Sequence, residues 1–215
     1  MHASTALVAL GLAGLSAAAP YGEQPTGSWK GGNGAQIVSY LTKFDNVEAG
    51  LVGGLELYFN LNALDVGNGL AGVKPQSAPN VVAFDAIATA TEGEPSILAD
   101  FDGSTVDSFN LQSFYFGCVV ANAETAASVP VDCSITITGY RNGEEVASQD
   151  ADFTTGSLLT LVANMDKVTL SSDFSNVDKV TFAIDGALDS TLDAALFDNF
   201  AYDVTLKQGY SSFKA

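Results

Sequence analysis

The chain has 215 residues, of which 47% are hydrophobic and 15% are charged. That length fits a single domain with a full core, and the composition is that of a globular protein and not of a disordered one. Acidic residues outnumber basic residues by 25 to 8, which gives a formal net charge of −17. Because such a surface repels phosphate groups and anionic lipid heads, we expect neither nucleic acid nor a membrane surface as partner.

The first residues predict a secretory signal peptide over residues 1–19. Residues 6–15 form an apolar run too short to span a bilayer, and small residues suited to cleavage follow it. We therefore expect a secreted, extracellular monomer without a membrane span. His2 is the only histidine of the chain. Cleavage would remove it, which excludes a Ser-His-Asp triad, a Cys-His dyad and a histidine-zinc site in the mature protein.

Strand patterns begin after a flexible leader at 20–38, and we assign residues 39–207 to one domain followed by a short tail at 208–215. A first strand within 35–47 ends in the tripeptide Phe-Asp-Asn at 44–46. The stretch 55–62 alternates strictly, which is the pattern of a half-buried strand. Its inward residues are Leu55, Leu57, Phe59 and Leu61, and its outward residues include Tyr58, Asn60 and Asn62. A long Gly/Pro loop at 65–80 follows and is a candidate functional loop.

The stretch 107–147 predicts two paired strands joined by the only two cysteines, Cys118 and Cys133. The return strand, 131–139, alternates, and an Asn-Gly turn at 142–143 closes the next hairpin. On the outgoing strand the apolar parity changes near Ser113, which predicts a bulge. Both cysteines share the parity of large apolar neighbours, so they can meet on one face. In an oxidising compartment we expect them to form a disulfide.

Further short strands are expected at 81–90, 95–101, 158–162, 168–170, 180–184 and 196–206. No segment of helical length shows a 3.6-residue period, and 189–196 forms at most a short turn. Roughly ten short strands separated by turn signals predict an all-β fold, an antiparallel β-sandwich of jelly-roll type in one domain.

Several short strings resemble a group of secreted fungal proteins that are galactose-binding-like jelly rolls, mostly without assigned activity. These strings are SFYFGC at 113–118, ASVP at 127–130, Cys133, TGY at 138–140 and FDN at 197–199. The Phe-Asp-Asn near each end is also similar to carbohydrate-binding modules in which carboxylates near the chain ends hold a structural calcium ion. The resemblance covers residues 40–206 and implies a galactose-binding-domain-like fold. A surface row of tryptophans is absent, which argues against crystalline cellulose as ligand.

The carboxylates of the two tripeptides predict a cation site. Asp198 shares even parity with Phe200 and Tyr202, so we place it on the core-facing side, where an unpaired carboxylate is costly to bury. First and last strands often lie side by side in such a sandwich, which would bring Asp45 close to Asp198. Oxygen ligands without histidine suit Ca²⁺. The alternative is a carboxylate that only caps backbone N–H groups.

The outward residues Tyr58, Asn60 and Asn62 predict a binding site for extracellular or cell-wall carbohydrate. Aromatic faces stack on sugar rings, while amides supply donors and acceptors for hydroxyls. The alternative for Tyr58 is an ordinary strand residue without a ligand. The alternatives for the protein are an extracellular structural or host-interaction role, or an enzyme. Without histidine the feasible enzymes are a glycoside hydrolase with paired carboxylates or a polysaccharide lyase. We expect a protein without catalytic residues.

Overall fold

A computed structural model describes residues 37–45, 50–52, 57–65, 72–121, 128–156, 161–185 and 193–210. The strands are β1 (Ile37–Thr42), β2 (Gly50–Val52), β3 (Tyr58–Asp65), β4 (Val73–Lys74), β5 (Asn80–Asp85), β6 (Ser96–Leu98), β7 (Val106–Ala121), β8 (Ser128–Val131), β9 (Cys133–Arg141), β10 (Glu144–Phe153), β11 (Ala163–Asn164), β12 (Asp166–Thr169), β13 (Lys179–Asp185) and β14 (Asp193–Leu206). A short helix, α1 (Ala86–Glu92), and a 3-10 turn, η2 (Ser172–Phe174), complete the described elements. The predicted signal peptide and almost all of the predicted leader lie outside these ranges.

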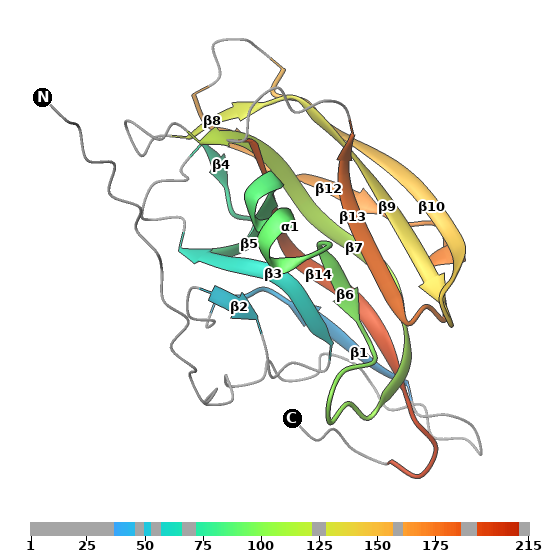
Figure 1. The fold of residues 1–215 in the computed structure, drawn as a ribbon. Coiled ribbons are helices and arrows are strands. Elements are labelled where there is room, and N and C mark those ends of the chain that lie inside the picture. The colour runs from blue at the N-terminus through green and yellow to red at the C-terminus, as the bar shows by residue number, and fades with distance from the viewer. Residues whose placement is uncertain are drawn as a thin grey trace, which may run out of the picture.

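The chain folds as an all-β, mostly antiparallel sandwich in a single domain. Its main sheet has 12 strands, with the path β10-β9-β13-β6-β3-β5-β14-β7-β12 and with β1, β2 and β8 paired beside it (Figure 1). The two ends of the path meet through Gln149 of β10. Its side chain donates to the Thr169 carbonyl at 3.1 Å and accepts from the Ser171 N–H at 3.0 Å. The sheet is therefore nearly closed around its core.

The core is built largely from phenylalanine rings. Phe182 and Phe197 have ring centroids 5.0 Å apart, and Phe114 lies 5.3 Å from Phe200. All four side chains are almost completely inaccessible to solvent. Burying rings of this size supplies most of the apolar area that stabilises a β-sandwich. The core lies between β14 and β7 on one side and β13 on the other.

The alternation predicted for the stretch 55–62 is confirmed in β3. Leu57, Phe59 and Leu61 are no more than 1% exposed, whereas Tyr58, Asn60 and Asn62 are only half-buried. Leu55 lies outside the described residues. The period of two therefore identified correctly which side chains face the core.

The disulfide prediction is confirmed, but the strand pairing predicted around it is wrong. Cys118 and Cys133 are bonded, with their Cα atoms 6.2 Å apart. Cys118 pairs with Val131 of β8, whereas β9 pairs with β10 and β13. The reason is that β7 already has β14 along one edge and β12 and β8 along the other. The chain leaves β7 after Val131, so the disulfide connects β7 to the start of a strand elsewhere in the sheet.

A helix interrupts the strand predicted at 81–90. The strand ends at Asp85, whose carboxylate accepts from the Ala88 N–H at 2.6 Å and caps α1. Gly93, with φ of 92°, ends the helix. A helix of seven residues is too short to produce a detectable 3.6-residue period. Also, β14 begins at Asp193, inside the short turn expected at 189–196.

The bulge predicted near Ser113 is present. In the pairing of β14 with β7, the register shifts between Asp198 and Ala201 and again between Ala201 and Tyr202. Ser113 faces Ala201 at this irregularity, and Asn199 adopts a left-handed φ of 53°.

Within the described ranges, no helix has both the length and the apolar character needed to cross a membrane.

Candidate functional site

The outer face of β3 carries the residues predicted to bind carbohydrate. Tyr58, Asn60 and Asn62 project from the same side of the strand, away from the core. The Tyr58 ring lies beside that of Phe101, with centroids 6.3 Å apart. Phe101 was not predicted, because it lies in the turn after β6 and no local pattern links that turn to β3. The structure thus adds a second aromatic ring to the predicted set.

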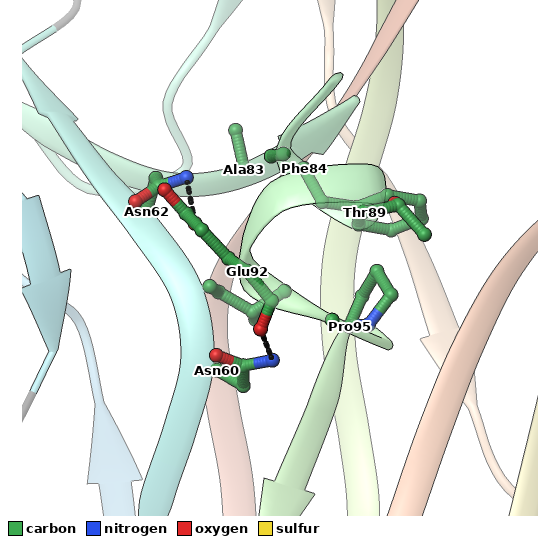
Figure 2. Close-up of a pocket in the computed structure, with 10 residues that line it drawn as sticks. Asn60, Asn62, Ala83, Phe84, Thr89, Glu92 and Pro95 are labelled. Atoms are coloured by element: carbon green, nitrogen blue, oxygen red, sulfur yellow. Dashed lines mark hydrogen bonds between the residues drawn. The ribbon is translucent and has the colours of Figure 1, made fainter. Parts of the chain in front are cut away.

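The helix α1 and the turn after it are attached to this face by the two asparagines. Asn60 Nδ2 donates to the carbonyl of Glu92 at 3.3 Å and to that of Glu94 at 2.9 Å. Asn62 Nδ2 donates to the Glu92 carboxylate at 2.7 Å (Figure 2). These bonds use the nitrogen ends of both amides. Each amide also has an oxygen, which can still accept a hydrogen bond.

A shallow depression lies between α1 and β3. Its lining includes Asn60, Asn62, Phe84, Thr89, Glu92 and Pro95. Its empty volume is about 160 Å³, a figure that includes open solvent. The site is therefore a surface with an aromatic patch beside it, and not an enclosed pocket.

The second predicted site lies around Asp198, whose side chain is 0% exposed. The strands β1 and β14 are neighbours in the sheet, with Thr42 opposite Phe200, as predicted for the first and last strands. This pairing brings the end of β1 close to β14. As a result Asp45 lies near enough for its charge to act on Asp198. Asn46 lies outside the described residues.

The side of the sheet predicted for Asp198 is wrong. Asp198 is directly opposite Tyr115, whereas Phe197 is opposite Phe116. Directly opposed residues share a face, and Phe197 packs in the core against Phe116. Asp198 therefore lies on the outer face, where the segment containing Ser77 covers it. The register shift after Asp198 reverses the alternation of inward and outward side chains along β14. The parity that Asp198 shares with Phe200 therefore predicts the wrong face.

Ser77 and Asn199 supply the hydrogen bonds to the Asp198 carboxylate. The Ser77 N–H donates to Oδ2 at 2.6 Å, and the Asn199 N–H donates to Oδ1 at 2.7 Å. The Ser77 hydroxyl lies 3.3 Å from each carboxylate oxygen but only 2.8 Å from Asn199 Oδ1. Ser77 belongs to the loop 65–80, so at this residue the loop contributes to the Asp198 cluster. No sequence pattern indicated Ser77.

Carboxylate and amide oxygens gather around the Ser77 hydroxyl in the described part of this cluster. The Ser77 hydroxyl has one proton for three nearby oxygens, and the buried Asp45 Oδ1 has no hydrogen-bond partner among the described residues. Burial raises the pKa of Asp198 to about 6, and the charge of Asp45 raises it further, while the bonds from Ser77 and Asn199 oppose this rise. The cluster therefore favours the arrival of a positive charge, either a proton or a metal cation.

The oxygen atoms present fit a hard cation. Asp45, Asp198, Asn199 and Ser77 contribute carboxylate, amide and hydroxyl oxygens, the ligand types that Ca²⁺ prefers. The observation that supports the fit is that Asp45 Oδ1 is buried and has no hydrogen-bond partner in the part of the chain that the structure describes. Among the described residues there is no cluster of three or more His, Cys, Asp or Glu side chains. Neutral oxygens would therefore have to complete the coordination of Asp45 and Asp198.

Comparison with known proteins identifies no family. No protein-family model matches the chain. No curated protein matches its sequence. A solved structure with a similar outline is that of a DUF4465 family protein from Bacteroides caccae, at 13% identity and a TM-score of 0.45, covering 80% of this chain and 81% of that one.

Proposed function

We propose that this protein is secreted and, without catalysing a reaction, binds extracellular carbohydrate through the outer face of β3. The observation that supports this best is the grouping of Tyr58 and Phe101 beside Asn60, Asn62 and the Glu92 carboxylate. An aromatic ring offers its face to the C–H groups of a sugar, while amide and carboxylate oxygens accept from its hydroxyls. Because these polar groups are held by hydrogen bonds to α1 and its turn, little side-chain entropy would be lost on binding.

A glycan array of the mature protein tests this proposal. We expect binding to at least one extracellular or cell-wall glycan, and Tyr58→Ala should abolish it. Tyr115→Ala is the matched control, because Tyr115 is also a half-buried strand tyrosine on the outside of the sheet, on β7. Circular dichroism and the melting temperature verify that both variants fold. Undiminished binding by Tyr58→Ala would remove this face from the site. No binding by the native protein would favour an extracellular structural or host-interaction role.

A second proposal concerns Asp45 and Asp198, which we infer hold a structural Ca²⁺. The support is the fully buried Asp198 carboxylate together with the buried Asp45 Oδ1, which has no hydrogen-bond partner among the described residues. A cation bound only by the native state raises the melting temperature by mass action. We expect millimolar Ca²⁺ to raise the melting temperature relative to chelator, and Asp198→Asn to remove the rise. The same melting temperature in both conditions would leave Asp198 as a carboxylate that caps the N–H groups of Ser77 and Asn199.

A further inference from the structure

A row of side chains crosses the outer face of the sheet at right angles to the strands. Tyr58 of β3 is opposite Leu98 of β6, Leu98 is opposite Lys179 of β13, and Lys179 is opposite Tyr140 of β9. Directly opposed residues of antiparallel strands present their side chains on the same face. The row therefore extends from Tyr58 across three strand spacings, or about 14 Å. At its far end lies another aromatic ring, that of Tyr140.

Contacts among its members fix the middle of this row. Lys179 Nζ lies 5.4 Å from the centroid of the Tyr140 ring and 2.6 Å from a Glu94 carboxylate oxygen. The carbonyl of Glu94 accepts from Asn60 on β3. One set of contacts thus connects Tyr140, Lys179 and the turn after α1 to the strand that carries Tyr58. A ligand lying along the row would meet side chains that are already positioned.

The next row of residues along the same strands is polar. It contains Thr138, Thr181, Ser96 and Asn60, each opposite the next across β9, β13, β6 and β3. Thr181 and Ser96 are only 6% and 4% exposed, so of this row only Thr138 and Asn60 are partly open to a ligand. Beyond them, Asp150 and Asp185 lie 3.0 and 2.8 Å from the Thr136 hydroxyl. These carboxylates disfavour an anionic ligand on this face.

From this arrangement we propose that the row Tyr58–Leu98–Lys179–Tyr140 is one extended site for a linear, neutral polysaccharide whose chain runs across the strands. Tyr58 with Phe101 stacks on one part of the chain and Tyr140 on another, several sugar rings away. Lys179 and Glu94 hydrogen-bond to hydroxyls between them. This inference rests on the proposed carbohydrate binding and adds that the ligand is a long chain, so affinity depends on chain length.

The test uses calorimetric titration with disaccharides and hexasaccharides of neutral β-linked glucans, xylans and mannans. We expect the native protein to bind a hexasaccharide at least tenfold more tightly than the matching disaccharide. Tyr140→Ala should remove most of that difference and leave disaccharide binding unchanged. Tyr115→Ala is a close control, because Tyr115 also faces a lysine directly across the strands, with Lys167 Nζ 5.9 Å from its ring. It should leave the length dependence unchanged.

The outcomes separate the two proposals. If Tyr58→Ala abolishes binding but Tyr140→Ala leaves the length dependence intact, the row is overturned and the patch on β3 stands. Equal affinity of the native protein for the disaccharide and the hexasaccharide also overturns the row. If the native protein binds none of these oligosaccharides, the extended site is overturned. An array that shows no other glycan bound then refutes the carbohydrate proposal as well.

Discussion

The outer face of β3 and the Asp198 cluster are both polar, but they differ in the balance of their hydrogen bonds. On β3, the amide nitrogens of Asn60 and Asn62 each have acceptors supplied by Glu92 and its turn. Around Asp198, oxygens compete for few protons, and the buried Asp45 Oδ1 has none from the described residues. In the first region the amide N–H groups have their acceptors without a ligand, and the residues form an open surface. The second is short of positive charge, so its stability should depend on protons and cations.

The largest expected effect is a dependence of stability on pH in the presence of chelator. The pKa of Asp198 is raised from 3.8 to about 6, mainly by burial. A raised carboxyl pKa means that the folded state binds the proton more tightly than the unfolded state does. The contribution of this group to stability is therefore fully present below about pH 4 and is lost as the pH rises through about 6. The loss from this group amounts to at most about 3 kcal/mol.

Urea unfolding across this pH range measures the effect, with Asp198→Asn as the control that lacks the titrating group. Millimolar Ca²⁺ should oppose the loss at neutral pH, because a bound cation favours the ionised carboxylate. A native protein whose pH profile matches that of Asp198→Asn would show that Asp198 does not titrate as its surroundings indicate.

An intermediate effect is expected from Asp45→Asn, which tests the shortage of donors directly. The variant removes the charge that raises the pKa of Asp198 and adds an N–H₂ group beside acceptors. In chelator at neutral pH we expect stability to increase by about 1 kcal/mol, while the increase in melting temperature caused by Ca²⁺ disappears. Lower stability in chelator together with an unchanged response to Ca²⁺ would contradict both the charge imbalance and the cation site.

The sequence predicts the two regions to different degrees, and the reason is geometric. An alternating strand such as β3 shows its faces directly, so the positions of Tyr58, Asn60 and Asn62 follow from the period of two. Asp198 is different, because a register shift within β14 reverses its side and only the partner strand reveals that shift. Pattern reasoning found the carboxylate and its burial but placed it on the wrong face.

Long-range contacts account for the other residues that the sequence did not reveal. Ser77 reaches Asp198 across 121 positions of the chain, and Tyr140 joins the row of Tyr58 only through β6 and β13. The disulfide was predictable because the chain has only one pair of cysteines. The strand pairing around it was not, since both edges of β7 are occupied by distant or unexpected strands.

The smallest expected effect is at the satisfied site on β3. Asn62→Ala removes the 2.7 Å bond to Glu92, and a partly exposed bond of this kind contributes about 0.5–1.5 kcal/mol to stability. Water can replace the lost partner on both sides, so the lower end of that range applies. A double-mutant cycle with Glu92→Ala isolates the bond, and we expect a coupling of about 0.5 kcal/mol by urea unfolding. Asn62→Ala should show no change in its response to Ca²⁺, because Asn62 is not among the oxygens that surround Asp198. A coupling near zero would mean that the Asn62–Glu92 bond does not help to attach α1 to β3, and that Glu92 is not fixed for ligand binding.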